Sequence, residues 1–85
     1  MSADLMQVLE NVVREELNKV NVGERVRTVD FVARVIDRVK PALKLDEAGE
    51  ARVRPMVVDV LWRLQRLGLV RFSDDLITFE KVQSS

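Results

Sequence analysis

The chain has 85 residues, 47% of them apolar and 33% charged, and its 14 basic side chains balance 14 acidic ones. Cysteine and histidine are both absent, which excludes disulfides and removes the commonest general base, the thiol nucleophile and most transition-metal ligand sets. No stretch approaches the roughly 18–20 unbroken apolar residues of a membrane span, and no cleavable signal precedes the first expected helix. We therefore expect one small cytoplasmic domain over residues 1–82, with a frayed tail at 83–85; its arginine-rich composition loosely suits a thermophile.

The net charge of zero conceals a basic centre between two acidic ends. Residues 1–24 carry two basic and five acidic side chains, residues 25–71 carry eleven and six, and residues 72–85 carry one and three. The net charges of these segments are −3, +5 and −2. A basic centre of this kind can form a footprint for phosphate, but a mixed, solvated surface explains the same counts equally well.

A first helix is predicted from the start of the chain to about residue 20. Ser2 is placed to cap it, and Asp4 complements the dipole of its first turn. Apolar residues recur at spacings of three and four, the period of a helix with one buried face. They are Leu5, Leu9, Val12, Val13, Leu17 and Val20. Asn21 and Gly23 are expected to end the helix, and its broad apolar stripe is a candidate interface for a symmetric homodimer.

Residues 24–27 are expected to form a brief strand or extended link that leads into a second helix. Thr28 is the expected cap of this helix, with Asp30 in its first turn. Phe31 and Val35 are expected to lie to one side of the buried face. That face is predicted to contain Val29, Val32, Ala33, Ile36 and Val39.

Pro41 should end or bend the second helix, because proline lacks an amide proton and restricts the residue before it. Alternatively, Pro41 begins a short extra turn through Leu43 and Leu45 that Gly49 stops.

The third helix has the clearest pattern. Pro55 suits its first turn, and Gly68 suits the left-handed position that follows its last turn. Apolar residues at helical spacing lie between them: Val57, Leu61, Leu64 and Leu67. Residues 69–72 are then predicted as a strand, 73–75 as a turn and 76–82 as a second strand.

The order helix, short strand, helix, helix, two-stranded hairpin resembles the winged helix-turn-helix superfamily. The matching residues are Leu61-x-x-Leu64-x-x-Leu67-Gly68-Leu69-Val70, which look like the end of a recognition helix, its glycine cap and the first wing strand. The resemblance covers most of the chain and implies a mainly α fold with a small β-hairpin, that is, three helices plus a two-stranded wing. In this superfamily the third helix usually enters the major groove of DNA and the hairpin touches the backbone or minor groove. Many members are archaeal or bacterial transcription regulators that bind DNA as dimers.

The link between the second and third helices departs from that pattern. A helix-turn-helix pair is usually joined by about 3–4 residues. The segment from Pro41 to Arg54 is far longer, unless the third helix begins near Glu50 and tolerates Pro55 early in its course.

Seven arginines are candidates for contacts with nucleic-acid phosphates, which give affinity without reading sequence. They are Arg25, Arg27, Arg52, Arg54, Arg63, Arg66 and Arg71. The alternative is that these arginines form surface pairs with acids such as Asp59, Asp30 or Glu50, each worth little.

Two features of the sequence count against base reading by the third helix. Its early outward positions hold Met56, Val58, Asp59 and Trp62, which offer few hydrogen-bond donors to base edges. The hairpin turn is Asp74-Asp75, where DNA-binding wings commonly place Arg or Lys. Met56, Val58 and Trp62 instead form a candidate protein interface if the tryptophan is exposed, whereas a buried Trp62 is an ordinary core residue.

No enzyme is expected, because the three glycines are isolated and the acidic pairs Asp46-Glu47 and Asp74-Asp75 lie in predicted turns. Two hypotheses stay open. One is a dimeric DNA-binding winged helix, resembling a transcription regulator and held mainly by arginine–phosphate contacts. The other is a winged-helix protein-interaction module, a small subunit of a transcription or replication assembly. Neither requires a cofactor, a metal, a membrane or a small-molecule substrate.

Overall fold

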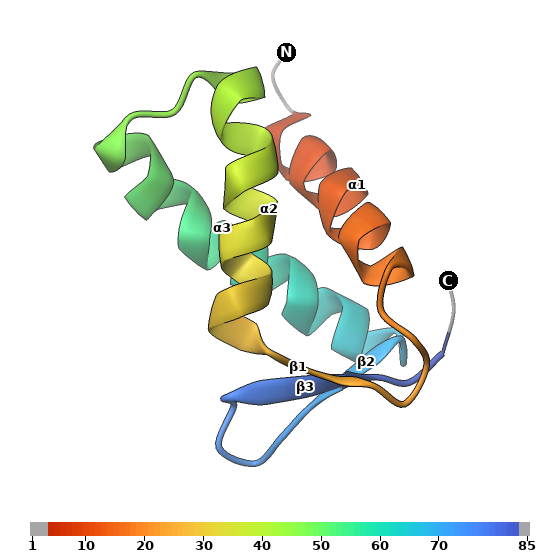
Figure 1. Cartoon of the computed structure of the whole chain (residues 1–85). Coiled ribbons are helices and arrows are strands. Elements are labelled where there is room, and N and C mark those ends of the chain that lie inside the picture. Colours follow the sequence, from red (N-terminus) through yellow and green to blue (C-terminus); the bar gives the residue numbers. More distant parts are fainter. Residues whose placement is uncertain (1–3, 84–85) are drawn as a thin grey trace.

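The computed structural model describes residues 4–83, which form three helices and a three-stranded antiparallel sheet (Figure 1). In chain order the elements are α1 (Asp4–Asn18), β1 (Arg25–Arg27), α2 (Thr28–Leu43), α3 (Glu47–Arg66), β2 (Val70–Phe72) and β3 (Thr78–Lys81). The expected cap Ser2 lies outside the described residues, as do positions 84 and 85 of the expected tail. Gln83, the first residue of that tail, donates from Nε2 to the carbonyl oxygen of Gly68 at 2.9 Å. Across residues 4–83, none of the helices combines the length and apolar character needed to cross a membrane.

The sheet has the strand order β1-β3-β2, so that β3 is the central strand. The expected hairpin is confirmed as the pair β2–β3, and the brief strand expected before the second helix adds to its other edge as β1. Val26, Phe79 and Phe72 lie opposite one another across the three strands. Because side chains alternate between the faces of a sheet, this row points toward the helices.

The core is formed where the three helices meet one another and the inner face of the sheet (Figure 1). The stripe predicted for α1 is largely confirmed, since Leu9, Val13, Leu17 and Val20 are all buried. This stripe is therefore covered by the chain itself and is not left open as a homodimer face. Val8 is the one large apolar residue of α1 that is classed as exposed within the described part of the chain.

The buried face of α2 contains Val32, Ile36 and Val39 as predicted, but it extends toward Phe31 and Val35 and not toward Val29. Phe31 and Val35 are fully buried, whereas Val29, expected to face the core, is 57% exposed. The cause is the aromatic pair between Phe31 and Phe79, whose rings meet edge to face with centroids 5.2 Å apart. Burying the largest side chain of the helix turns the valine of the first turn outward.

The start of α2 also differs from the expectation. Its N-cap is Arg27, which makes no side-chain capping hydrogen bond, and Thr28 is the first helical residue. The Thr28 hydroxyl instead donates to the carbonyl oxygen of Leu76, at 3.2 Å.

The link between α2 and α3 is only three residues long, at positions 44–46. Of the two effects expected of Pro41, an end to the second helix is wrong, since α2 continues through Pro41 to Leu43; the alternative of an extra turn stopped by Gly49 is wrong as well. Lys44 ends α2 in the left-handed conformation, with φ of 54°, and the Asp46 carboxylate caps α3 by accepting from the amide of Gly49 at 2.8 Å. The expectation that Pro55 lies in the first turn of the third helix is also wrong: α3 begins at Glu47, close to the alternative start near Glu50, and Pro55 lies inside the helix. Both prolines are exposed, so that water can reach the carbonyl groups they leave without a donor.

The end of α3 is as predicted. Gly68 has a φ of 81°, the amide of Leu69 donates to the Leu64 carbonyl, and the amide of Gly68 donates to the Gln65 carbonyl, both at 2.9 Å. These two bonds are the Schellman arrangement that closes a helix with a left-handed glycine. Leu67, expected to face the core, lies at this cap and is 57% exposed.

Candidate functional site

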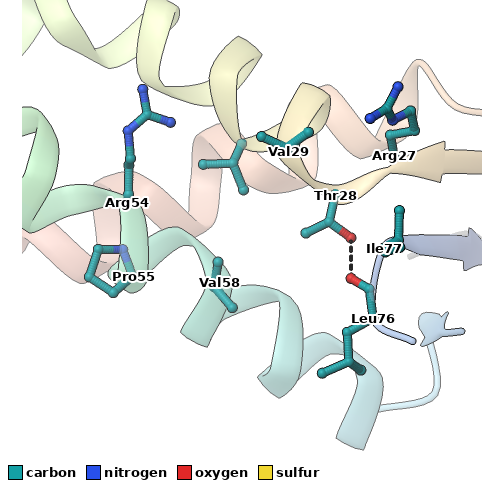
Figure 2. Close-up of a pocket in the computed structure, with 9 residues that line it drawn as sticks. Arg27, Thr28, Val29, Arg54, Pro55, Val58, Leu76 and Ile77 are labelled. Atoms are coloured by element: carbon teal, nitrogen blue, oxygen red, sulfur yellow. Dashed lines mark hydrogen bonds between the residues drawn. The ribbon is translucent and has the colours of Figure 1, made fainter. Parts of the chain in front are cut away.

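An apolar groove of about 540 Å³ lies between α2, α3 and the turn that joins β2 to β3 (Figure 2). Its volume falls within the range of roughly 300–1,000 Å³ that is typical of ligand-binding clefts. The residues that line it come from three separate parts of the sequence. They are Arg27, Thr28, Val29, Val32, Arg54, Pro55, Val58, Leu76 and Ile77.

Aliphatic side chains in this groove are unusually open to solvent. Val29 is 57% exposed, Ile77 55% and Leu76 50%. Single exposed apolar residues are ordinary on a protein surface, but a contiguous group of them is typical of an interaction site.

Leu76, which lines the groove, has an unfavourable backbone conformation. Its φ is 64°, a left-handed conformation that glycine adopts freely and that leucine rarely adopts. The turn enforces this conformation, since the amide of Leu76 donates to the Ser73 carbonyl at 3.0 Å and the amide of Ile77 donates to Asp75 Oδ1 at 3.0 Å. A non-glycine residue in this region costs on the order of 1–3 kcal/mol, and such strain is concentrated at functional sites.

Two hydrogen bonds fix the β2–β3 turn to the start of α2. The Thr28 amide donates to the Ile77 carbonyl at 2.8 Å, and the Thr28 hydroxyl donates to the Leu76 carbonyl, as Figure 2 shows. These bonds join two walls of the groove, and the carbonyl groups of Leu76 and Ile77 already have donors.

Arg27 and Arg54 are the two charged residues among those that line the groove, and they lie at opposite ends of it (Figure 2). Arg54 Nη2 is 3.8 Å from Glu50 Oε1, a long contact, while Lys40 Nζ holds the other oxygen of that carboxylate at 2.7 Å. The hydrogen bond to Glu50 also raises the pKa of Lys40 above its ordinary value. Arg27 has no acidic group within 4.0 Å among residues 4–83. The groove is thus apolar along its walls and positive at both ends.

The structure does not gather the seven predicted arginines on one surface. Arg63 pairs with Glu10 at 3.0 Å, and Arg71 pairs with Glu80 at 3.2 Å. Arg25 lies across the strands from the same Glu80, on the outer face of the sheet.

The remaining predicted arginines are spread along α3. Arg52 and Arg66 are exposed and, like Arg25, have no acidic side chain within 4.0 Å in the described part of the chain. Fourteen residues separate them, about 21 Å along the helix axis. Arg27 and Arg54 line the groove, whereas Arg25 and Arg71 line a separate, smaller hollow of about 70 Å³ on the sheet that also contains Glu80.

The predicted interface residues are also divided. Trp62 is half-buried and stacks on Phe72 of β2, with ring centroids 4.5 Å apart and 30° between the planes. Met56 and Val58 are half-buried against the core, and only Val58 of the three lines the groove. Trp62 therefore packs the β2–β3 hairpin against α3. It is neither a fully buried core residue nor an exposed interface residue, the two alternatives that the sequence left open.

Six groove residues are not predicted as site residues by the sequence: Thr28, Val29, Val32, Pro55, Leu76 and Ile77. Helical spacing places the two valines in the core, and local rules make Thr28 and Pro55 residues of helix starts. The one available signal was the pair Leu76-Ile77 directly after two aspartates of a turn, where polar residues are usual.

Within residues 4–83, no three His, Cys, Asp or Glu side chains come close enough together to hold a metal ion. Comparisons with models of known protein families, with curated proteins and with solved structures found no match. The groove and the charges around it are therefore the features from which a function is inferred.

Proposed function

We propose that this chain is a winged helix-turn-helix domain that acts as a non-enzymatic protein-interaction module, with the groove between α2, α3 and the β2–β3 turn as its binding surface. The order of the elements and the three-residue link between α2 and α3 support the fold assignment, because helix-turn-helix pairs are joined by about 3–4 residues. On this assignment α3 is the recognition helix and the β2–β3 hairpin is the wing. The superfamily resemblance makes a transcription or replication assembly the natural setting.

The observation that carries the proposal is the exposed aliphatic lining of the groove. Val29, Leu76 and Ile77 are each at least half exposed, and they come from two different elements that converge on one hollow. Covering apolar surface contributes about 25 cal/mol per Å², so that an apolar partner segment gains affinity here. Base edges and phosphates would gain little from the same side chains, because they are recognised by hydrogen-bond donors and positive charge.

A matched pair of variants tests this proposal. Ile77→Gln removes an aliphatic group that is 55% exposed inside the groove, and Leu67→Gln removes one that is 57% exposed at the end of α3, outside it. Tagged full-length chains are used to capture proteins from extracts of the source cells, and the bound proteins are quantified by mass spectrometry. A partner held equally by wild type and Leu67→Gln, but about tenfold less by Ile77→Gln, supports the groove. Equal capture by all three chains contradicts it.

Duplex DNA remains a second candidate partner, because Arg25, Arg27, Arg52 and Arg66 have no acidic side chain within 4.0 Å among the described residues. Arginine–phosphate contacts release counterions, and binding by four of them would weaken steeply with salt. Fluorescence anisotropy of a labelled random-sequence duplex, at low and near-physiological salt, measures this. Salt-sensitive binding that Arg25→Gln and Arg52→Gln weaken would favour DNA, whereas the protein-interaction proposal expects no binding near physiological salt.

A further inference from the structure

We infer that the groove binds an acidic amphipathic α-helix of a partner protein. This inference rests on the proposed function and adds to it the conformation and the charge of the bound segment. Three features of the groove support this inference: its charge, the hydrogen bonds that its backbone groups already make, and its apolar lining.

The charge of the groove selects an acidic occupant. Arg27 and Arg54 lie at its two ends, the first without an acidic neighbour within 4.0 Å among residues 4–83 and the second with only the 3.8 Å contact to a carboxylate shared with Lys40. The N-terminus of α2, the positive end of a helix dipole, begins at the same place, and the Arg27 side chain does not cap it. Asp30 in the first turn is exposed but does not line the groove.

The acids of the β2–β3 turn do not cancel this charge. Asp75 faces into its own turn, where its carboxylate accepts from the Ser73 hydroxyl at 2.6 Å and from the Ile77 amide at 3.0 Å. These hydrogen bonds lower the pKa of Asp75. Asp74 is exposed, and neither acid is among the residues that line the groove.

The backbone of the groove selects a helix over an extended strand. The carbonyl groups of Leu76 and Ile77 accept from Thr28, and the amides of these two residues donate to Ser73 and Asp75. A bound strand would therefore find no partners on Leu76 or Ile77 for its own amide and carbonyl groups, and burying such groups unpaired is costly. A helix satisfies its backbone internally and presents only side chains to a groove.

The apolar lining of the groove suits one face of an amphipathic helix. Valine, proline, leucine and isoleucine side chains from α2, α3 and the turn form its walls, and arginines close its ends. Apolar anchors at positions i, i+3 or i+4 and i+7 of a partner helix would fill the centre. Carboxylates at either end of that helix would meet the guanidinium groups.

A display library of random 15-residue peptides tests the inference. Peptides are selected on the protein and counter-selected on the uncharged variant Ile77→Gln, so that groove-dependent binders survive without selection for their charge. The selected sequences are expected to carry apolar residues at helical spacing and a net negative charge, and to become helical on binding by circular dichroism. Selected peptides that are basic, neutral or extended would overturn the inference while leaving the protein-interaction proposal standing.

A charge exchange supplies the decisive control. The double variant Arg27→Glu, Arg54→Glu should weaken the best acidic peptide by at least about tenfold, since each replacement turns an attraction into a repulsion. Replacing the acidic residues of that peptide by lysine should restore binding to the double variant. Binding that is insensitive to both exchanges contradicts the acidic character of the partner.

Failure to select any groove-dependent peptide would also overturn the inference. The capture experiment with Ile77→Gln and Leu67→Gln then separates the two proposals. If it still finds a groove-dependent protein, only the acidic helix is wrong; if it finds none, the function of the groove is wrong as well. If the wild-type protein binds duplex DNA but no peptide, and Arg27→Glu, Arg54→Glu abolishes the DNA binding, the function proposed for the groove is wrong as well.

Discussion

The ammonium group of Lys81 on β3 donates to the carbonyl oxygen of Val20 at 2.8 Å and also reaches the Leu17 carbonyl at 3.1 Å. Lys81 is only 5% exposed, an unusual degree of burial for a lysine. The last carbonyl groups of a helix lack partners within it, and they form the negative end of its dipole. Lys81 therefore caps the end of α1 from the far end of the chain and joins the central strand to the first helix.

Replacing Lys81 by methionine should destabilise the protein by about 2–3 kcal/mol, because it leaves two buried carbonyl groups without their charged donor. Urea denaturation followed by circular dichroism measures the loss. Lys40→Met is the matched control, since Lys40 forms an exposed pair with Glu50 and such pairs contribute less than about 1 kcal/mol. Equal effects of the two substitutions would show that Lys81 is not an anchor.

Stability should fall in acid through Glu16, a buried residue of α1. Burial alone would raise the pKa of Glu16, but hydrogen bonds and charges from Lys19 and Arg38 together outweigh it, and the pKa is lowered from 4.5. A carboxylate with a lowered pKa in the folded state stabilises the fold above its unfolded value, and this contribution is lost as pH falls through the folded pKa. We expect the free energy of unfolding to decline as pH falls below about 4.5.

Glu16→Gln should flatten that decline, because the amide does not titrate. Urea denaturation at a series of pH values between 7 and 3 measures the slope. Glu15→Gln is the control, since Glu15 binds the same Arg38 at 2.7 Å from an exposed position. An unchanged acid slope in Glu16→Gln would assign the pH dependence to other carboxylates.

Lys44 is a second site where the backbone favours glycine. It ends α2 with φ of 54° and ψ of 50°, a conformation that costs a side-chain-bearing residue roughly 1–2 kcal/mol. Lys44→Gly relieves this strain, partly offset by the greater freedom of glycine in the unfolded chain, for a net gain of about 0.5 kcal/mol. The melting temperature should rise by about 2–4 °C. Ala42→Gly, inside the last turn of the same helix, should lower it.

The helix ends show which parts of this fold can be predicted from the sequence and which cannot. The left-handed Gly68 and the stripe through Leu61 and Leu64 follow from local rules, and both are as predicted. The helix boundaries predicted from the two prolines are wrong, because a proline shows where a helix loses one hydrogen bond and not whether packing compensates for the loss. The true boundary uses a left-handed lysine and the Asp46 cap, neither of which is conspicuous in the sequence.

The groove itself could not be predicted from the sequence. It joins residues 27–32, 54–58 and 76–77, whose proximity depends on how α2 and α3 pack against the hairpin. Val29 fits a helical stripe by spacing, and only the burial of Phe31 against Phe79 turns it toward solvent. The arginines at the ends of the groove were identified individually, but their shared location depends on tertiary structure.

Leu76→Gly should increase the stability of the free protein and decrease its affinity for a groove-dependent partner. Glycine adopts φ near 64° without strain, so that the free protein should gain about 0.5–1 kcal/mol of stability, measured by thermal melting. The same substitution removes an aliphatic side chain that is 50% exposed in the groove, so that affinity for a groove-dependent partner should fall about tenfold. Ile77→Ala, at a neighbouring position without positive φ, should weaken binding with no gain in stability. If Leu76→Gly raises stability and leaves affinity unchanged, the leucine has no role in the groove and its conformation is an accident of the turn; a loss of both would mean that the side chain serves the fold.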